Sequence, residues 1–308
     1  MTTRRQFLST SVAGSLLLGS SPAWLSAAHG AASDSMLKRA IPASGESVPA
    51  IGMGTSGSFE IPRGSAQYQA LKEVLERFFA GGGTLIDIAP TYGNAEDILG
   101  SLLSEAGSRK QAFIATKLSG VNGRDEGLAQ FAASLESLKT DKVELLQVHN
   151  LRDWKTQMAV ARELKAQGKV KYVGVTHYVE SAQDQLAEVV QATKPDFLQI
   201  NYSVTQRGAE KRVFPLAKEL GVAVLANRNF DDGALFDKVK GKPLPGWAAE
   251  AGITSWAQMF LKFALSHEAV TAVIPATGKP ERQSDNLKAG AGPLLTAAQK
   301  TGLIALVG

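Results

Sequence analysis

Eight short apolar segments recur along the chain from about residue 50 onward, and this recurrence constrains the fold more than any other feature of the sequence. The segments are IGMG (51–54), TLIDIA (84–89), AFIATK (112–117), ELLQVH (144–149), YVGVT (172–176), FLQIN (197–201), VAVLAN (222–227) and TAVIP (271–275). Their short length and their lack of polar alternation are typical of strands that are buried on both faces, as in a parallel sheet.

The segments between these strands have helical periodicity. In one of them, apolar side chains recur three or four positions apart, at Leu71, Val74, Leu75 and Phe78. Gly81 and Gly221 follow such segments shortly before the next strand, where glycine commonly ends a helix. Eight strands that are each followed by a helical segment predict an α/β fold, the (β/α)8 or TIM barrel. A doubly wound open sheet is the alternative arrangement of such strands.

The barrel is predicted to occupy residues 33–308 as a single domain. Ahead of its first strand, KRAIPASGESVPA (38–50) is typical of a β-hairpin with Ser44 and Gly45 at the turn. We expect this hairpin to cover the bottom of the barrel. The last helix is expected at about 280–289.

Residues 1–32 are predicted to be a twin-arginine (Tat) signal peptide. Arg4 and Arg5 are followed by Phe-Leu, then by a short apolar run over 12–18 and by small residues over 26–32. The apolar run is too short for a membrane anchor, because a span needs ~20 apolar residues. The signal implies contact with the Tat export machinery, a periplasmic location and no stable membrane insertion. A chance arginine pair on a cytoplasmic protein is the alternative.

Charge and composition exclude several classes of function. The chain of 308 residues has a net charge of +4, of which Arg4 and Arg5 contribute two, and its other charges are dispersed. A dispersed surplus of this size predicts no nucleic-acid surface. The absence of cysteine excludes disulfides and thiol chemistry. The four histidines have no metal-ligand spacing, so we expect no metal site.

Four polar side chains follow successive strands at the end where barrel chemistry occurs. Asp87 and Tyr92 follow the second strand, Lys117 closes the third and His149 closes the fourth. A carboxylate in a buried strand needs a partner, and Lys117 on the next strand can supply it. A neighbouring cation lowers the pKa of a tyrosine from its usual ~10, which favours acid catalysis. A structural ion pair is the simpler explanation of Asp87 and Lys117 alone.

The sequence resembles the aldo-keto reductase family over essentially all of residues 37–289. The matching motifs are KRAIPASGESVPAIGMGT (38–55), LIDIAPTYGNAE (85–96), FIATK (113–117), LLQVH (145–149), GVTHY (174–178), LQINY (198–202) and IPATGKPERQSDN (274–286). The resemblance implies that Tyr92 is the general acid, that Lys117 and Asp87 tune it, and that His149 positions a carbonyl. It also implies hydride transfer from a nicotinamide cofactor, normally NADPH, with NAD less favoured.

The resemblance implies a cofactor site as well. Its residues would be Gly54, Thr55, Asp87, Thr176, His177, Gln199, Asn227, Arg228, Thr277, Arg282 and Asn286. Arg282 would hold a 2′-phosphate, which selects NADP over NAD. Asn227 and Arg228 depart from the family pattern, because many members have an aromatic residue there that stacks on the nicotinamide. Ala276 stands where a lysine often follows Ile-Pro.

We therefore expect an NADP(H)-dependent enzyme that reduces a small aldehyde or ketone and acts as a monomer. Phe59, Trp154 and Tyr178 are candidates for lining the substrate mouth. Two alternatives remain open. One is a periplasmic oxidoreductase that retains its cofactor and cycles between two substrates. The other is a non-catalytic regulatory subunit that binds the cofactor.

Overall fold

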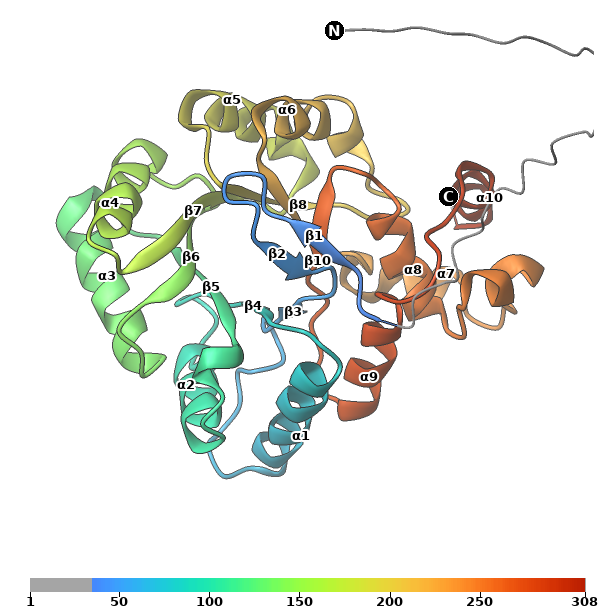
Figure 1. Cartoon of the computed structure of the whole chain (residues 1–308), viewed down its shortest axis with the longest axis horizontal. Helices are drawn as coiled ribbons and strands as arrows, with labels where there is room; N and C mark the ends of the chain where they lie inside the picture. The colour runs from blue at the N-terminus through green and yellow to red at the C-terminus, as the bar shows by residue number, and fades with distance from the viewer. Residues whose placement is uncertain (1–34, 308) are drawn as a thin grey trace, which may run out of the picture. The chain divides into compact units, whose positions relative to one another are not determined.

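The computed structural model describes residues 35–307, and its centre is a barrel of eight parallel strands (Figure 1). In sheet order the strands are β3 (Met53–Gly54), β4 (Leu85–Asp87), β5 (Phe113–Leu118), β6 (Val143–His149), β7 (Val170–Thr176), β8 (Phe197–Asn201), β9 (Ala223–Asn227) and β10 (Val270–Val273). Parallel bridges from Ile51 to Val273 and from Gly54 to Ala276 join the first strand to the last. The predicted TIM barrel is thus confirmed, and each of the eight predicted strands is present.

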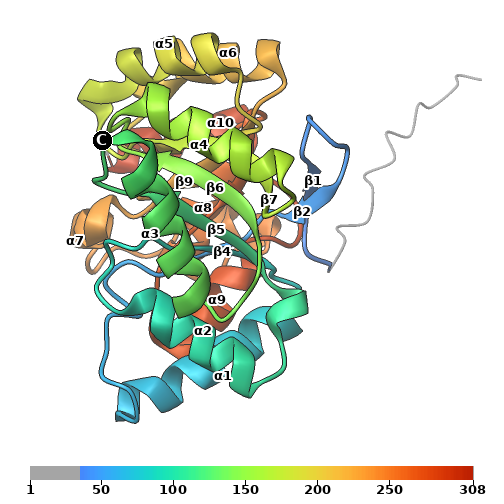
Figure 2. The same cartoon turned by 90° about the vertical axis from the view of Figure 1, so that its left-hand side faces the viewer.

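Helices follow the strands on the outside of the barrel, as Figure 2 shows for α3 and α4 beside β5 and β6. The helices are α1 (Ala66–Ala80), α2 (Ala95–Glu105), α3 (Gly123–Ser137), α4 (Trp154–Ala166), α5 (Gln183–Thr193), α6 (Val213–Leu220), α7 (Ala234–Lys238), α8 (Trp256–Leu265), α9 (Pro280–Lys288) and α10 (Ala297–Val307). Gly81 and Gly221 end α1 and α6 as predicted, and Gly221 has a φ of 65°, which glycine adopts without strain.

The spacing of Gly52, Gly54 and Gly57 equals that of a G-x-G-x-x-G turn, so the sequence leaves the doubly wound sheet open at this point. The structure assigns these glycines another purpose. A Cβ on Gly54 would lie 2.7 Å from the backbone oxygen of Ile274, so only glycine fits where the first and last strands meet. The helix that follows begins only at Ala66. The alternative of a doubly wound sheet is therefore wrong.

The N-terminal hairpin closes one end of the barrel. Strand β1 (Lys38–Ala40) pairs antiparallel with β2 (Ser47–Pro49), and Figure 2 shows the hairpin at the end opposite to α7. Ile41 and Val48 of the hairpin are buried in one cluster with the first inward-facing side chains of the strands, such as Leu85, Phe113 and Phe197. The prediction that the hairpin covers the bottom of the barrel is confirmed.

Strand alternation then determines what lies at the other end. Successive side chains of a strand point to opposite faces, so every second residue points into the barrel. Two positions beyond Leu85 and Phe197 come Asp87 and Gln199, and both are buried. The apolar layer at the hairpin end is thus followed by a polar layer at the carboxyl ends of the strands.

Helix α10 follows the helix that the sequence analysis expected to be the last, and it is only weakly amphipathic, with Leu303 and Val307 buried. Its helical pattern is therefore faint in the sequence.

The signal-peptide prediction for residues 1–32 lies outside the described residues. No helix within residues 35–307 is both long enough and apolar enough to cross a bilayer.

Candidate active site

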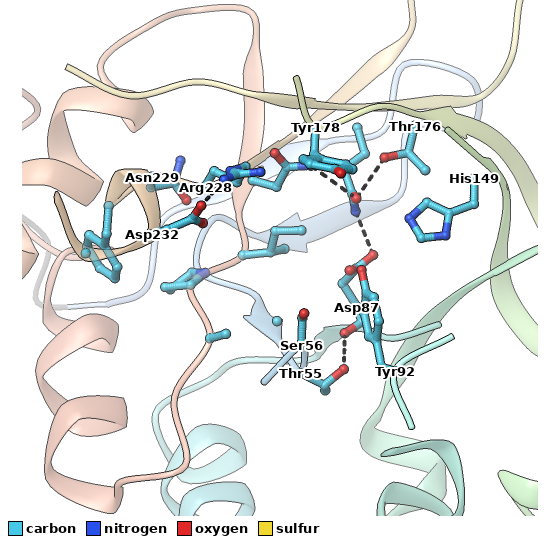
Figure 3. A pocket seen from close by; sticks show the side chains of 18 of the residues that line it. Thr55, Ser56, Asp87, Tyr92, His149, Thr176, Tyr178, Arg228, Asn229 and Asp232 are labelled. Carbon is cyan, nitrogen blue, oxygen red and sulfur yellow. Dashed lines mark hydrogen bonds and ion pairs between the residues drawn. The ribbon is translucent and has the colours of Figure 1, made fainter. Parts of the chain in front are cut away.

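A cavity of about 520 Å³ opens at the carboxyl ends of the strands (Figure 3). Residues of six strands and of the loops that follow strands line it, and they include Thr55, Asp87, Tyr92, His149, Thr176, Tyr178, Gln199, Asn227, Arg228 and Asp232. Most of the predicted site residues are thus brought together in one place.

An ion pair lies beneath the floor of this cavity. The Nζ atom of Lys117 lies 2.8 Å from Oδ2 of Asp87 and donates a second hydrogen bond of 2.8 Å to the backbone oxygen of Ile88. Lys117 is 1% exposed and Asp87 is 4% exposed. Because two buried charges are costly unless each has a close partner, this pair is held together tightly. The expected pairing of Asp87 with Lys117 is present.

The other carboxylate oxygen of Asp87 is bound by two glutamines. Nε2 of Gln199 donates to Oδ1 at 2.6 Å, and Nε2 of Gln147 donates to the same atom at 3.3 Å. Gln147 is not among the predicted site residues, although its place two residues before His149 on β6 puts both side chains on the inward face. Both carboxylate oxygens of Asp87 are therefore held by neighbouring side chains, Oδ2 by Lys117 and Oδ1 by two amides.

Tyr92 lies beside this ion pair, in the loop that follows β4. The Lys117 ammonium is 5.0 Å from the centroid of the Tyr92 ring. Burial raises the pKa of Tyr92 above its ordinary value, while the charge of Lys117 opposes that rise and the charge of Asp87 adds to it. Lys117 does lower the pKa of Tyr92, as expected. The net pKa is nevertheless raised, because the effect of burial is larger than that of the lysine. Tyr92 is a protonated donor at neutral pH.

His149 faces Tyr92 across the cavity. Their ring centroids are 6.2 Å apart and the rings are nearly perpendicular. Burial lowers the pKa of His149 to about 3, and the charges of Lys117 and His177 act in the same direction. His149 is therefore a neutral imidazole at physiological pH. Its Nδ1 atom lies 2.6 Å from Oγ of Ser119, a contact that the sequence did not predict.

A row of amide and hydroxyl groups continues from Asp87 along the cavity wall. Oε1 of Gln199 accepts hydrogen bonds from Oγ1 of Thr176 at 2.9 Å and from Nδ2 of Asn227 at 3.3 Å. The Oδ1 atom of Asn227 is buried and has no partner among the described residues. A buried acceptor without a partner is costly, so this atom is suited to a ligand that donates an N–H. Thr55 donates to the backbone oxygen of Asp87 at 2.9 Å.

Arg228 joins two loops beside the cavity. Its guanidinium carbon lies 5.0 Å from the ring centroid of Tyr178, in the loop after β7, and it forms an ion pair with Asp232, in the loop after β9 (Figure 3). The backbone of Arg228 has a φ of 53°, which is uncommon for a residue with a side chain. Arg228 is thus held against Tyr178 by its own loop.

The remaining predicted cofactor residues do not line the cavity. His177 lies next to Tyr178, and its Nδ1 accepts hydrogen bonds from the backbone of Tyr178 and Val179. Thr277 precedes α9, and Arg282 and Asn286 lie on that helix. Arg282 is exposed, and no other described side chain pairs with its guanidinium.

Two of the three candidates for the substrate mouth lie elsewhere. Phe59 is fully buried in the hydrophobic core, so its assignment to the mouth is wrong. Trp154 begins α4 and packs against the core rather than lining the cavity. An aromatic side chain on a loop can line a substrate mouth only if it is not buried in the core, and the sequence alone does not show whether it is buried. The cavity is lined by Tyr178, the third candidate, and by Phe230 and Phe236.

Metal chemistry has no support in the described part of the chain. Residues 35–307 contain no group of three or more histidine, aspartate or glutamate side chains that is arranged to hold a metal ion.

Comparison with known proteins gives a consistent result. A sequence profile described as "Aldo/keto reductase family" matches residues 50–301. "Aldo-keto reductase str7" of Strobilurus tenacellus is 33% identical over 180 residues, which cover 54% of this chain and 52% of that protein. "Methylglyoxal reductase YeaE" of Escherichia coli is 28% identical over 245 residues, which cover 77% of this chain and 84% of that protein. The chain spans about half the length of str7 and three fifths of that of a Bacillus subtilis relative, "Aldo-keto reductase YhdN".

Solved structures share the fold. An aldo-keto reductase from Klebsiella pneumoniae in complex with NADPH superposes with a TM-score of 0.73 at 23% identity, and the match covers 88% of this chain and 96% of that one. At that level of identity the likeness establishes the barrel and no more.

Proposed function

This chain belongs to the aldo/keto reductase family, and on that premise we propose that it reduces an aldehyde or ketone to an alcohol with NADPH, with Tyr92 as the proton donor. The observation that carries the proposal is that Asp87, Tyr92 and His149 line one cavity at the carboxyl ends of the strands, while the buried Lys117 forms an ion pair with Asp87 next to it. Four desolvated polar groups at one point are costly for a purely structural site.

Each of the four side chains has a separate part in this proposal. Tyr92 donates its phenolic proton to the carbonyl oxygen as that oxygen gains charge. Lys117, 5.0 Å from the tyrosine ring, stabilises the phenolate that remains, and Asp87 keeps the buried lysine charged. The neutral His149 donates a hydrogen bond that holds the carbonyl oxygen near Tyr92. When bound, the nicotinamide supplies the hydride that reaches the carbonyl carbon.

The cavity wall fits a nicotinamide carboxamide. Oδ1 of Asn227, buried and without a partner among the described residues, would accept an N–H of the carboxamide, and Gln199 and Thr176 lie next to it. These residues would hold the ring beside Tyr92 even though the aromatic residue typical of many relatives is absent. His177 would lie beside Thr176 at the carboxamide end, and Thr277, Arg282 and Asn286 would contact the adenosine and phosphate part of the same cofactor.

NADPH is the preferred cofactor in this proposal. Arg282 is free to pair with a 2′-phosphate, which NADH lacks. The K. pneumoniae structure contains NADPH, whereas one E. coli relative is called an NADH-specific methylglyoxal reductase. The names of the relatives include methylglyoxal reductases and aryl-alcohol dehydrogenases, so they support a carbonyl substrate in general.

The direct test is the oxidation of NADPH by purified residues 33–308 with a panel of small aldehydes, among them methylglyoxal and a benzaldehyde. Consumption of NADPH that depends on the aldehyde, with formation of the alcohol in equal amount, supports a reductase. Tight NADPH binding without turnover of any carbonyl would instead support a regulatory, non-catalytic role.

We further propose that the protein is exported with its cofactor bound. A reductase that exchanges NADPH in every cycle would be idle in the periplasm, where no NADPH pool is expected, because occupancy follows mass action. Arg228, packed over Tyr178 and paired with Asp232, joins the loops after β7 and β9 and is positioned to slow cofactor release. A second substrate would then restore the reduced form within the same monomer.

The export proposal is tested by cell fractionation. The intact chain and an Arg4→Lys, Arg5→Lys variant are expressed, and the desalted periplasmic protein is analysed for nucleotide and for mass under native conditions. We expect the intact chain alone to reach the periplasm, as a monomer with NADP(H). Export that survives the double substitution would contradict the signal, and exported protein without nucleotide would contradict retention.

A further inference from the structure

Ser119 makes the closest polar contact of the imidazole of His149. It follows β5 directly, two residues after Lys117, and is 3% exposed. Its Oγ atom lies 2.6 Å from Nδ1 of His149, which is the distance of a strong hydrogen bond. Among the described residues, this hydroxyl is the one hydrogen-bond partner of Nδ1.

Gln130 on α3 fixes the backbone of Ser119. The backbone N–H of Ser119 donates to Oε1 of Gln130 at 2.7 Å, and Nε2 of Gln130 donates to the backbone oxygen of Ser119 at 2.8 Å. One amide side chain thus satisfies both backbone groups of the same residue. Such a pair of bonds defines where the Ser119 hydroxyl lies, because the loop cannot turn without breaking both.

The protonation state of His149 decides how this contact works. The imidazole is neutral, since burial and the charge of Lys117 disfavour its charged form. A neutral imidazole carries a proton on one nitrogen only, and the hydrogen bond at one nitrogen determines which. If the Ser119 hydroxyl donates to Nδ1, the proton of His149 must be on Nε2. In the reverse arrangement, Nδ1 would donate to Oγ, so the hydroxyl hydrogen of Ser119 would have no acceptor among the described residues and Nε2 would be left as a bare acceptor.

We propose that Ser119, held by Gln130, is a positioning residue that keeps His149 in the tautomer with its proton on Nε2. This inference rests on the proposed function, because only that tautomer can donate a hydrogen bond to a carbonyl oxygen next to Tyr92. The other tautomer would present a lone pair to the oxygen and repel it.

The chain of contacts therefore runs from α3 through the loop after β5 to the ring on β6. None of its members except His149 lines the cavity. Ser119 and Gln130 would thus affect the reaction without contacting substrate or cofactor, and a loss of either is expected to change kcat more than the affinity for NADPH.

The test is the tautomer of His149 in the resting protein, measured by ¹⁵N NMR of the histidine side chains. The signals of His149 are assigned from their loss in a His149→Gln variant. We expect the wild-type protein to show the proton on Nε2, Ser119→Thr to keep it there, and Ser119→Ala to give a mixture of the two tautomers. A wild-type imidazole protonated on Nδ1, or a tautomer that is unchanged in Ser119→Ala, would overturn the inference.

Kinetics provide the second measurement. Ser119→Ala should lower kcat by roughly 10-fold, the change expected for one hydrogen bond, while NADPH affinity stays constant and Ser119→Thr restores most of the rate. Ser101→Ala is the matched control, because Ser101 is a buried serine on α2 whose hydroxyl donates one hydrogen bond to Asp97 outside the cavity. A rate of Ser119→Ala equal to that of Ser101→Ala would contradict the inference.

The two failures can be told apart. If the wild-type protein shows the Nε2 tautomer and this depends on Ser119, but no carbonyl is reduced, the proposed function fails and the positioning contact stands. If carbonyls are reduced but the tautomer does not depend on Ser119, the positioning role fails and the proposed function stands.

Discussion

Nε2 of Gln199 donates a 2.6 Å hydrogen bond to Oδ1 of Asp87, and so joins β8 to β4 through the interior of the barrel. The same Gln199 accepts hydrogen bonds from Thr176 and Asn227. One amide thus connects the buried ion pair to the part of the wall that we assign to the nicotinamide.

Replacing Gln199 by Leu should destabilise the fold. The substitution leaves Oδ1 of Asp87 with only the longer bond from Gln147 and removes the acceptor used by Thr176. An unsatisfied buried group costs about 1–3 kcal/mol, so the free energy of unfolding should fall by that order. Urea denaturation measures it, and an unchanged midpoint would mean that water or another group replaces the amide.

Lys117→Met should be more severe, because it leaves Asp87 as an uncompensated buried charge. Breaking a buried ion pair from one side typically costs about 3–5 kcal/mol, whereas removing both charges costs much less. The double variant Lys117→Met, Asp87→Leu is therefore expected to be more stable than the single one. Urea denaturation of the two single variants and the double variant gives the coupling energy. Additive losses would show that the two charges do not depend on each other.

The stability of the protein should decrease on acidification, in part because of His149. Its pKa is about 3 in the folded state and 6.5 in the unfolded state, so the unfolded chain binds more protons between those values. The contribution of His149 is present above pH 6.5 and is lost as the pH falls towards 3. In His149→Gln, the free energy of unfolding should therefore fall less between pH 7 and pH 4. Equal slopes for both proteins would contradict a depressed pKa.

Arg282→Ala should weaken NADPH binding selectively. Since Arg282 is exposed on α9, its contact with a 2′-phosphate would be partly screened by solvent and is worth about 1 kcal/mol, or roughly 5-fold in Kd. Fluorescence titration with NADPH and NADH measures the two affinities. Lys288→Ala, which removes another exposed cation of α9, is the matched control. An equal loss for both cofactors would place Arg282 away from the 2′-phosphate.

The fold could be predicted from the sequence because its signals are local. Buried strands such as FLQIN (197–201), which matches β8 at both ends, are read from apolar runs, and Gly81 and Gly221 mark the ends of helices. Helix α10 was not predicted, because its apolar residues do not form one clear stripe and its packing depends on the rest of the barrel.

The part of the site that could be predicted consists of polar residues at the carboxyl ends of the strands. Asp87, Lys117 and His149 could be found in this way, and the strand alternation that places His149 inside the barrel would also have indicated Gln147. Ser119 could not be found, since its role depends on a loop conformation that Gln130 fixes from a different helix. Phe59 was misassigned because nothing in its neighbours shows that the loop turns it into the core.

In the proposed reaction, Tyr92 donates the proton to the carbonyl oxygen of the substrate. The most direct measurement compares Tyr92→Phe with Tyr172→Phe in steady-state reduction of an aldehyde, together with NADPH binding by fluorescence. Tyr172 is a suitable control because its hydroxyl contacts Ser44 and Glu46 at the hairpin end of the barrel. We expect Tyr92→Phe to lower kcat by at least about 100-fold, the size of general acid catalysis, with NADPH affinity retained, and Tyr172→Phe to keep most of the activity. Reduction by Tyr92→Phe at the rate of the wild-type protein would contradict the role of Tyr92 as proton donor.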